Sequence, residues 1–246
     1  MKLTQAGTLY QLAFMPRLFP VNCYMVEEEE ESLTLIDAAM PFSAKAIAET
    51  ARRIGKPIAR IVLTHAHSDH IGALDTLKQM LPEATVYISA RDARLLAGDV
   101  TLDPGEYTSP IKGGVPKPGQ IRTKPDVLLH DGDRIGSLLA VATPGHTPGS
   151  MSFVDTRNQS LVVGDAIQVR GGAAVSGQLK PLFPFPALAT WSKHTALDSV
   201  RKLAELQPSL VAAGHGRMLT APLDTLRRII GEAEAAMGPA SAERRA

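Results

Sequence analysis

His65-Ala66-His67-Ser68-Asp69-His70 is the stretch of sequence from which the rest of the chain can be interpreted. Three imidazoles and a carboxylate follow an apolar run at 61–63 that predicts a strand. Imidazole nitrogen and carboxylate oxygen are ligands that zinc and related metals take in proteins. Side chains two residues apart leave a strand on the same side, so His65 and His67 can converge before Asp69 and His70 enter the next helix. A chance match to four such positions is improbable, on the order of one in several thousand. The stretch predicts a metal-binding loop.

Composition indicates an ordinary globular protein. The 246 residues are 44% hydrophobic and 21% charged, which fits one domain spanning 1–246. A net charge of +1 and only 4% aromatic residues argue against a nucleic-acid partner. The single cysteine, Cys23, excludes an intrachain disulfide, and neither a signal peptide nor a membrane span is recognisable. We therefore expect a cytoplasmic protein with a small-molecule substrate and no membrane partner, whose oligomeric state the sequence does not set.

Strands and helices alternate in both halves of the chain, which predicts an α/β fold with sheet in the middle and helices outside. Two irregular stretches, 99–126 and 168–190, interrupt the pattern, and a loop as long as the first is either a lid or a surface excursion. The end of the chain, 238–246, is expected to fray. The strands are expected at 8–14, 22–26, 33–36, 58–63, 85–88, 127–129, 134–135, 138–143, 151–154, 160–163 and 210–212, and the helices at 43–54, 71–80, 89–96, 187–206 and 222–237.

Three more polar residues stand where predicted strands run into glycine-rich loops, namely His146, Asp165 and His215. Loops at strand ends are where a rigid scaffold places chemistry, and glycine lets the backbone pass close to a crowded centre. Together with the opening motif they make five histidines and two aspartates. Seven candidate ligands exceed one tetrahedral zinc site and suit two ions that keep open positions for water. His130 and His194 lack this placement and are interpreted as structural.

The seven residues, in this order, resemble the hydrolase signature of the metallo-β-lactamase superfamily. The early segments Asn22-Cys23-Tyr24 and Leu35-Ile36-Asp37 are similar to strands of that superfamily as well. The resemblance covers nearly the whole chain and implies a four-layer αββα sandwich with its metal site at one edge, between the two sheets.

The resemblance also implies how the ligands are divided between two metal ions. It assigns His65, His67 and His146 to one ion, and Asp69, His70 and His215 to the other, with Asp165 bridging the two. Asp37 is expected to lie behind the ligands. The superfamily often has Asp-x-Gly at that place, whereas this chain has Asp37-Ala38-Ala39, so the local turn is expected to differ.

Such a centre implies a zinc-dependent hydrolase with two Zn²⁺ per chain, although iron or manganese would suit the same ligands. Two metals lower the pKa of a shared water from roughly 15.7 to near 7. The resulting bridging hydroxide is expected to attack a carbonyl carbon or a phosphoryl phosphorus. Asp69 is the expected catalytic residue, because it can orient the nucleophile and pass a proton to the leaving group. An ester, lactone or thioester is the expected substrate.

Several superfamily activities remain open. True β-lactamases generally lack the bridging aspartate, and one class has arginine in place of His70, so antibiotic hydrolysis is disfavoured. Acyl-homoserine lactonases carry a tyrosine where this chain has Gln168, and glyoxalase II enzymes have a longer helical region after the last ligand. A glyoxalase II-like thioesterase or a lactonase stays an alternative. So do a persulfide dioxygenase-like oxidoreductase with a single iron and a binding module without activity.

The irregular stretches are the expected source of substrate specificity. Their apolar side chains suggest a partly hydrophobic pocket, although any one of them can instead pack its loop onto the core. The candidate substrate-binding residues are Phe14, Met15, Phe19, Gln168, Phe183 and Phe185, with Leu182 and Trp191 beside them.

Overall fold

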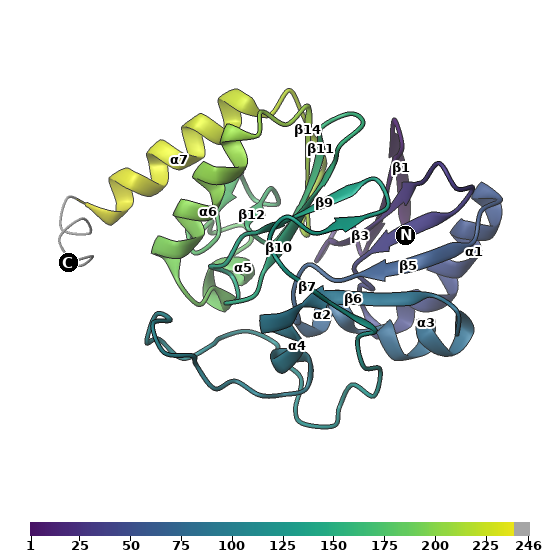
Figure 1. The fold of residues 1–246 in the computed structure, drawn as a ribbon. Coiled ribbons are helices and arrows are strands. Elements are labelled where there is room, and N and C mark those ends of the chain that lie inside the picture. Colours follow the sequence, from purple (N-terminus) through teal and green to yellow (C-terminus); the bar gives the residue numbers. More distant parts are fainter. Residues whose placement is uncertain (239–246) are drawn as a thin grey trace.

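Two β-sheets face each other at the centre of the molecule, and helices cover the outer face of each (Figure 1). This arrangement, seen in a computed structural model that describes residues 1–238, is the four-layer αββα sandwich that the sequence predicts. The frayed tail expected at 238–246 lies, apart from Gly238, outside the described residues. None of the helices in the described part of the chain is both long and apolar enough to cross a membrane.

The first sheet comes from the N-terminal half, and its seven strands are ordered as they occur in the chain. Its first four strands pair antiparallel, and the later ones pair parallel. The parallel connections pass through helices on the outer face, as such crossovers require. The strands are β1 (Lys2–Ala6), β2 (Leu9–Phe14), β3 (Val21–Glu27), β4 (Leu33–Ile36), β5 (Ile58–Val62), β6 (Thr85–Ser89) and β7 (Val127–Leu129), and the helices are η1 (Pro41–Ser43), α1 (Ala44–Ile54), α2 (Ser68–Ile71), α3 (Leu74–Met80) and α4 (Ala90–Leu96).

The second sheet comes from the C-terminal half and has the order β15-β14-β11-β10-β9-β8. Only β11 and β14 pair parallel, with α6 on the crossover between them. A separate two-stranded ribbon, β12 and β13, contacts α6 and α7 through β13. The elements are β8 (Arg134–Ile135), β9 (Leu138–Ala142), β10 (Met151–Asp155), β11 (Ser160–Gly164), β12 (Ile167–Gln168), β13 (Ala174–Val175), α5 (Phe185–Ala189), α6 (Lys193–Glu205), β14 (Leu210–Ala213), β15 (Leu219–Thr220) and α7 (Leu223–Met237).

Three apolar cores fill the spaces between the four layers. The central one joins the two sheets and contains Tyr24, Val62 and Phe153, all of which are buried. A second core packs the first sheet against α1, α3 and α4, and a third packs the other sheet against α6 and α7. Because most strands are buried on both faces, they are apolar along their length rather than alternating.

The structure differs from the expected elements in two helices. The predicted helix at 71–80 is two shorter helices, α2 and α3, separated at Gly72 and Ala73. The predicted helix at 187–206 breaks after α5, because the backbone amides of Trp191 and Ser192 leave helical geometry to donate to the carbonyls of His146 and Gly145. The side chain of Ser192 then caps α6 by accepting from the Thr195 amide. The strands β1, β12, β13 and β15 were not expected.

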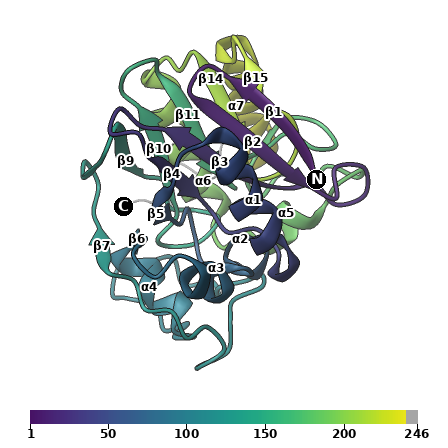
Figure 2. The same ribbon diagram turned by 90° about the vertical axis from the view of Figure 1, so that its right-hand side faces the viewer.

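Several strands of both sheets end at the same edge of the sandwich. β5, β11 and β14 each run directly into one of the loops that carry predicted ligands. Figure 2 shows β1 and β2 lying beside β14 and β15, so that the outer strands of the first sheet meet the C-terminal sheet at this side. The fold thus brings loops from both halves of the chain together.

Candidate metal centre

All seven predicted ligands meet at this edge, and their atoms form three overlapping groups. Asp69 is the most exposed of the seven, with 25% of its side chain accessible, and the others are buried. Within each group the candidate ligand atoms lie within 4.8 Å of one another. The groups are His65, His67 and His146; His65, His70 and Asp165; and Asp69, His70 and His215.

Asp165 lies between the histidines of the two predicted ion sites. Its Oδ1 is 3.5 Å from His70 Nε2. Its Oδ2 is 3.4 Å from His146 Nε2 and 3.1 Å from His215 Nε2. One carboxylate therefore contacts histidines of both predicted ligand sets.

The buried atoms that point inward are ones that a metal would satisfy. In the described part of the chain, His65 Nε2, His70 Nε2 and Asp165 Oδ1 are buried without a hydrogen-bond partner. Buried polar atoms without partners are rare in folded proteins because they cost free energy. Imidazole nitrogen and carboxylate oxygen suit zinc, iron and manganese. The residues present therefore fit a metal centre.

The outer ring nitrogens of all five histidines have partners, which fixes the orientation of each ring and turns its inner nitrogen toward the other candidate ligands. The contacts are His65 Nδ1 with Thr64 Oγ1 at 3.0 Å, His67 Nε2 with the Lys112 carbonyl at 2.8 Å, His70 Nδ1 with Asp37 Oδ2 at 2.8 Å, His146 Nδ1 with Ser176 Oγ at 3.1 Å and His215 Nδ1 with the Pro20 carbonyl at 2.7 Å.

The electrostatics of the site differ between its two sides. Burial lowers the pKa of His65 well below its ordinary value and that of His146 to about 3, so both imidazoles are neutral. Burial acts in the same direction on the pKa of His70, but the carboxylates around it, Asp165 first, outweigh burial and raise that pKa to about 10. The carboxylate-rich side attracts positive charge, which a metal cation would supply.

Asp37 lies behind the ligands, where the sequence places it. Its Oδ1 accepts from the Thr64 amide, and its Oδ2 accepts from Thr64 Oγ1 and His70 Nδ1, each at 2.8 Å. Ala39 occupies the position where the resemblance expects glycine, and its φ of 52° is in the left-handed region that glycine favours. An alanine in that conformation carries backbone strain.

The first half of the chain also holds the loop that bears His215. Asn22 Nδ2 donates to the carbonyls of Ala213 and Gly216, both at 2.8 Å. The Tyr24 hydroxyl donates to the Ala213 carbonyl at 2.6 Å, and Gln11 Nε2 donates to the Gly216 carbonyl at 2.7 Å. The Asn22-Cys23-Tyr24 segment thus supports a ligand loop from the other half of the sandwich.

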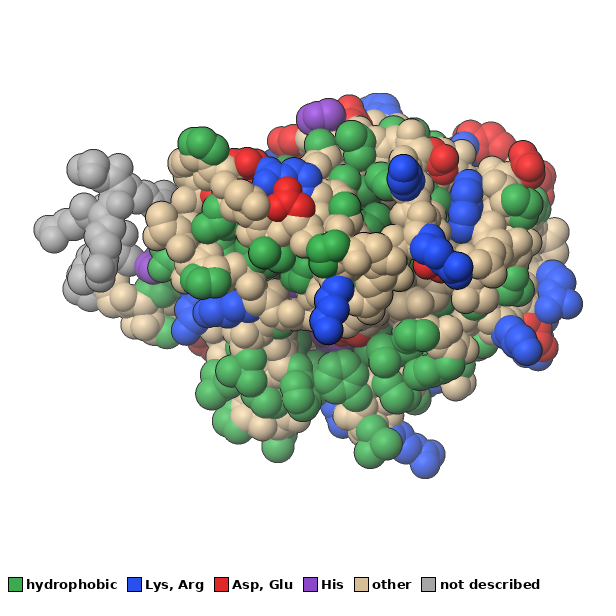
Figure 3. Space-filling view, turned by 90° about the horizontal axis from the view of Figure 1, so that it is seen from below, with side chains coloured by type: hydrophobic (Ala, Val, Ile, Leu, Met, Phe, Trp, Pro, Cys, Tyr) green, Lys and Arg blue, Asp and Glu red, His purple; other side chains and the backbone are tan. Residues whose placement is uncertain are grey.

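A cleft of about 440 Å³ opens onto the metal ligands. Of the predicted substrate-binding residues, Phe19 and Phe185 line it. Figure 3, which views the molecule from below, shows hydrophobic side chains gathered on this face. The lining residues are Phe19, Met40, His67, Ser68, Asp69, Gly113, Gly114, His146, Asp165, Phe185, Pro186, Leu188, Ala189 and His215.

The other predicted substrate-binding residues do not line this cleft. Phe14 is buried in the core beneath the first sheet, and Met15 takes a positive φ in the turn that follows. Gln168 is buried and donates to the backbone carbonyls of Phe183 and Arg170. Phe183 packs behind the site, with its ring 5.3 Å from that of His215. A strand or loop position beside a site does not determine which way its side chain points.

The irregular stretch 99–126 passes over the rim of the cleft. The Lys112 carbonyl contacts His67, and the Gly114 carbonyl accepts from the Ser68 amide at 2.9 Å. Helix α4 anchors the stretch through ion pairs, among them Arg91 with Glu106 at 2.7 Å. The loop that the sequence leaves as a lid or a surface excursion therefore supports a metal ligand.

The model of the metallo-beta-lactamase superfamily matches residues 16–215. This chain belongs to the metallo-beta-lactamase superfamily. It is 57% identical to the uncharacterized protein YobT of Bacillus subtilis (strain 168) over 234 residues, covering 95% of this chain and 99% of YobT. It is 34% identical to the probable metallo-hydrolase YflN of the same organism, covering 81% of each chain.

Two further proteins are similar to this chain. Human mitochondrial persulfide dioxygenase ETHE1 is 27% identical over 179 residues, covering 69% of this chain and 59% of ETHE1. The crystal structure of TTHA1623 in a di-iron-bound form superposes with a TM-score of 0.63 at 27% identity, covering 87% of this chain and 96% of that one.

One residue of this superfamily member that sequence reasoning missed is Asp92, on α4. Its carboxylate is buried and accepts from the Ala66 amide at 3.0 Å, the Thr147 hydroxyl at 2.8 Å and the Gly149 amide at 2.9 Å. Asp92 thereby joins the loop of His65 and His67 to the loop of His146. Its position in a short helix after Ser89 suggests only a helix cap, so the sequence carries no sign of this role.

We expect Asp92 to make stability depend on pH. Burial raises the pKa of its carboxyl from 3.8 to about 6. The folded protein then binds more protons than the unfolded chain between these two values, so the Asp92 contribution to stability is lost as the pH rises through about 6. The free energy of unfolding of the wild type, measured by urea unfolding, should fall by about 2 kcal/mol between pH 4 and pH 7 relative to that of Asp92→Asn. Parallel pH profiles for the two proteins would contradict this expectation.

Gly113→Ala should weaken metal binding in this superfamily member. A Cβ at Gly113 would lie 2.5 Å from His67 Cε1 and Nε2, so the ring or the loop must move. Loss of an outer support typically lowers metal affinity or activity roughly 10–100-fold. Gly105→Ala is the matched control, because both glycines have φ near 90° but nothing lies within 4 Å of a Cβ at Gly105. Equal metal affinities of the two variants, measured by competition with a chelator, would show that the contact does not matter.

Proposed function

We propose that this chain is a metal-dependent hydrolase that holds two metal ions, zinc in the first place, and cleaves an ester, lactone or thioester with an apolar acyl part. The observation that carries the proposal is the position of Asp165, which contacts the histidines of both ligand sets. The unpartnered inner atoms of His65, His70 and Asp165 support it. The similarity to the probable metallo-hydrolase YflN also supports it.

The protein's own groups would perform the positioning and the proton transfer. Bound metal ions would supply Lewis-acid polarisation and an activated water at neutral pH. Asp69 lines the cleft, and its Oδ2 lies 3.5 Å from His215 Nε2 and 3.8 Å from His70 Nε2. A carboxylate there can hold the nucleophile in line with the acyl carbon and then pass a proton to the leaving group.

The walls of the cleft favour an apolar acyl group. Phe19, Met40, Phe185, Leu188 and Ala189 contribute apolar surface. No lysine or arginine is among the described residues that line the cleft, so beyond the proposed metal ions it offers no side-chain cation for a phosphodiester or a free carboxylate. This composition is the reason for placing acyl substrates ahead of phosphorylated ones.

Metal analysis followed by a substrate panel tests the proposal. Protein purified without added metal should contain close to two ions per chain, mainly zinc. Aryl esters, lactones, thioesters and phosphodiesters should then be compared at equal concentration, and acyl compounds should be turned over fastest. A single iron per chain with oxygen consumption on a persulfide would instead establish the oxidoreductase alternative, which the similarity to ETHE1 favours.

A longer acyl chain should raise kcat/KM. Each buried methylene contributes about 0.8 kcal/mol, so a series of aryl esters from acetyl to octanoyl should gain up to about fourfold per methylene until the cleft is filled. Leu188→Ser should flatten the series, because Leu188 lines the cleft. Leu179→Ser is the matched control, since Leu179 is similarly exposed and is not among the lining residues. A series that is flat in the wild type would contradict the acyl assignment.

A further inference from the structure

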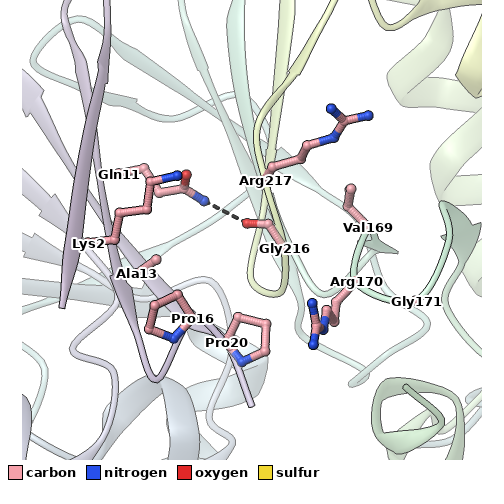
Figure 4. A pocket seen from close by; sticks show the side chains of 10 residues that line it. All are labelled: Lys2, Gln11, Ala13, Pro16, Pro20, Val169, Arg170, Gly171, Gly216 and Arg217. Carbon is pink, nitrogen blue, oxygen red and sulfur yellow. Dashed lines mark hydrogen bonds between the residues drawn. The ribbon is translucent and has the colours of Figure 1, made fainter. Parts of the chain in front are cut away.

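A second pocket lies on the other side of the loop that carries His215, and it shares no lining residue with the cleft. Its volume is about 290 Å³. β1, β2, the turn after β2, the loop after β12 and the loop after β14 form its walls (Figure 4). The lining residues are Lys2, Gln11, Ala13, Pro16, Pro20, Val169, Arg170, Gly171, Gly216 and Arg217.

All the charged side chains that line this pocket are positive. The described residues that line it include three cations, Lys2, Arg170 and Arg217, and no carboxylate. Within the described part of the chain none of the three forms an ion pair, whereas other surface arginines, such as Arg94 and Arg157, do. Like charges without counter-charges repel one another and attract an anion.

A backbone contact positions one of the three cations, Arg170. Arg170 Nη2 donates to the Arg17 carbonyl at 2.8 Å, which sets the direction of the guanidinium. In Figure 4 the Lys2 and Arg170 side chains come from opposite walls, whereas the guanidinium of Arg217 points upward, away from both. Guanidinium groups bind carboxylate and phosphate oxygens in pairs, and an ammonium adds a point charge.

The remaining walls suit a carbon skeleton. Ala13, Pro16, Pro20 and Val169 line the pocket with apolar surface beside the cations. The Gly216 carbonyl is already engaged by the Gln11 amide, so this carbonyl does not offer a free acceptor that would repel an anion. We propose that this pocket binds a small organic anion, whose carboxylate or phosphate meets the cations and whose apolar part lies against the prolines.

An anion bound in this pocket would contact the segments that hold His215, a candidate metal ligand. The Pro20 carbonyl accepts from His215 Nδ1 at 2.7 Å, and the amides of Val169 and Arg170 donate to the His215 carbonyl at 3.1 Å each. Two wall segments of the pocket, the turn with Pro20 and the loop with Val169 and Arg170, are therefore the ones that hold His215. The anion site goes beyond the proposed hydrolase function and does not depend on it.

Titration calorimetry on the metal-loaded protein tests the site, with inorganic phosphate, phenyl phosphate and benzoate as probes. We expect one saturable site per chain for phenyl phosphate, benzoate or both, and weaker binding of inorganic phosphate. Lys2→Gln and Arg170→Gln should each weaken binding about tenfold, the loss of one charged hydrogen bond. Lys45→Gln and Arg134→Gln, exposed cations elsewhere, are the matched controls and should bind like the wild type.

The outcomes separate the possible sources of binding. Tighter binding of phenyl phosphate assigns a phosphate head group, and tighter binding of benzoate assigns a carboxylate. Binding that survives in the Lys2→Gln/Arg170→Gln double variant and disappears with a chelator belongs to the metal centre and overturns the proposal. Equal affinity for inorganic phosphate and phenyl phosphate would overturn the proposal that the ligand is organic. A titration isotherm that does not saturate would show non-specific charge screening and would overturn the site itself.

Discussion

Replacing Asp69 by asparagine is expected to lower kcat on the best acyl substrate by about 10²–10⁴-fold, the range that a general acid–base group contributes. Asp69 combines cleft exposure with proximity to His70 and His215, so asparagine keeps the shape but cannot accept or deliver the proton. KM should change far less than kcat, because the apolar walls that bind the acyl group remain. Steady-state kinetics on the metal-loaded variant measures both.

The control for Asp69→Asn is Asp224→Asn, at a fully exposed aspartate on α7. Both variants should keep the circular dichroism spectrum and the melting temperature of the wild type. Undiminished turnover by Asp69→Asn at full metal content would remove Asp69 from the mechanism. If kcat of Asp69→Asn falls only in proportion to its metal content, Asp69 acts as a metal ligand and not in proton transfer.

Asp165→Asn is expected to reduce the metal content from two ions per chain to one or fewer and to abolish most turnover. The substitution removes the only charge that contacts both ligand sets in the described structure. The loss of metal affinity should exceed the roughly 10–100-fold that removal of an outer support costs. Asp37→Asn, which alters a support of His70 rather than a ligand, gives that comparison value.

Metal analysis by mass spectrometry after dialysis measures both variants. Metal-free Asp165→Asn should remain folded, because the carboxylate it loses is buried among histidines rather than in an apolar core. Two tightly bound ions in Asp165→Asn would show that Asp165 does not bridge, and an equal effect of Asp37→Asn would place both residues in the same supporting role.

The clustering of the seven candidate ligands could be predicted from the sequence because their pattern is local. His65, His67, Asp69 and His70 are neighbours in the chain, and each remaining candidate ligand lies in a loop soon after an apolar strand and adjoins glycine. Strand ends at one edge of a sandwich converge, so a pattern visible residue by residue becomes a site in space. The layer architecture followed from the same alternation of strands and helices.

The rest of the site could not be predicted because it depends on contacts across the chain. Asp92 meets partners 26, 55 and 57 residues away. The break before α6 depends on the carbonyls of Gly145 and His146, which a helical pattern does not reveal. Phe14 and Phe19 lie close together in the sequence, yet the Phe14 side chain enters the core and the Phe19 side chain lines the cleft. Side-chain direction in irregular segments is set by tertiary packing.

The supports of the ligand loops cross from one half of the sandwich to the other. Asn22 and Tyr24 hold the loop of His215, while Asp92 holds the loop of His146. Separation of the two halves would therefore disturb the loops of His146 and His215, because residues of the first half hold these loops of the second half. Opening of the sandwich would therefore disturb the metal ligands, and the free energy of metal binding would oppose that opening. Metal binding at one edge should thus slow hydrogen exchange in the central core between the two sheets.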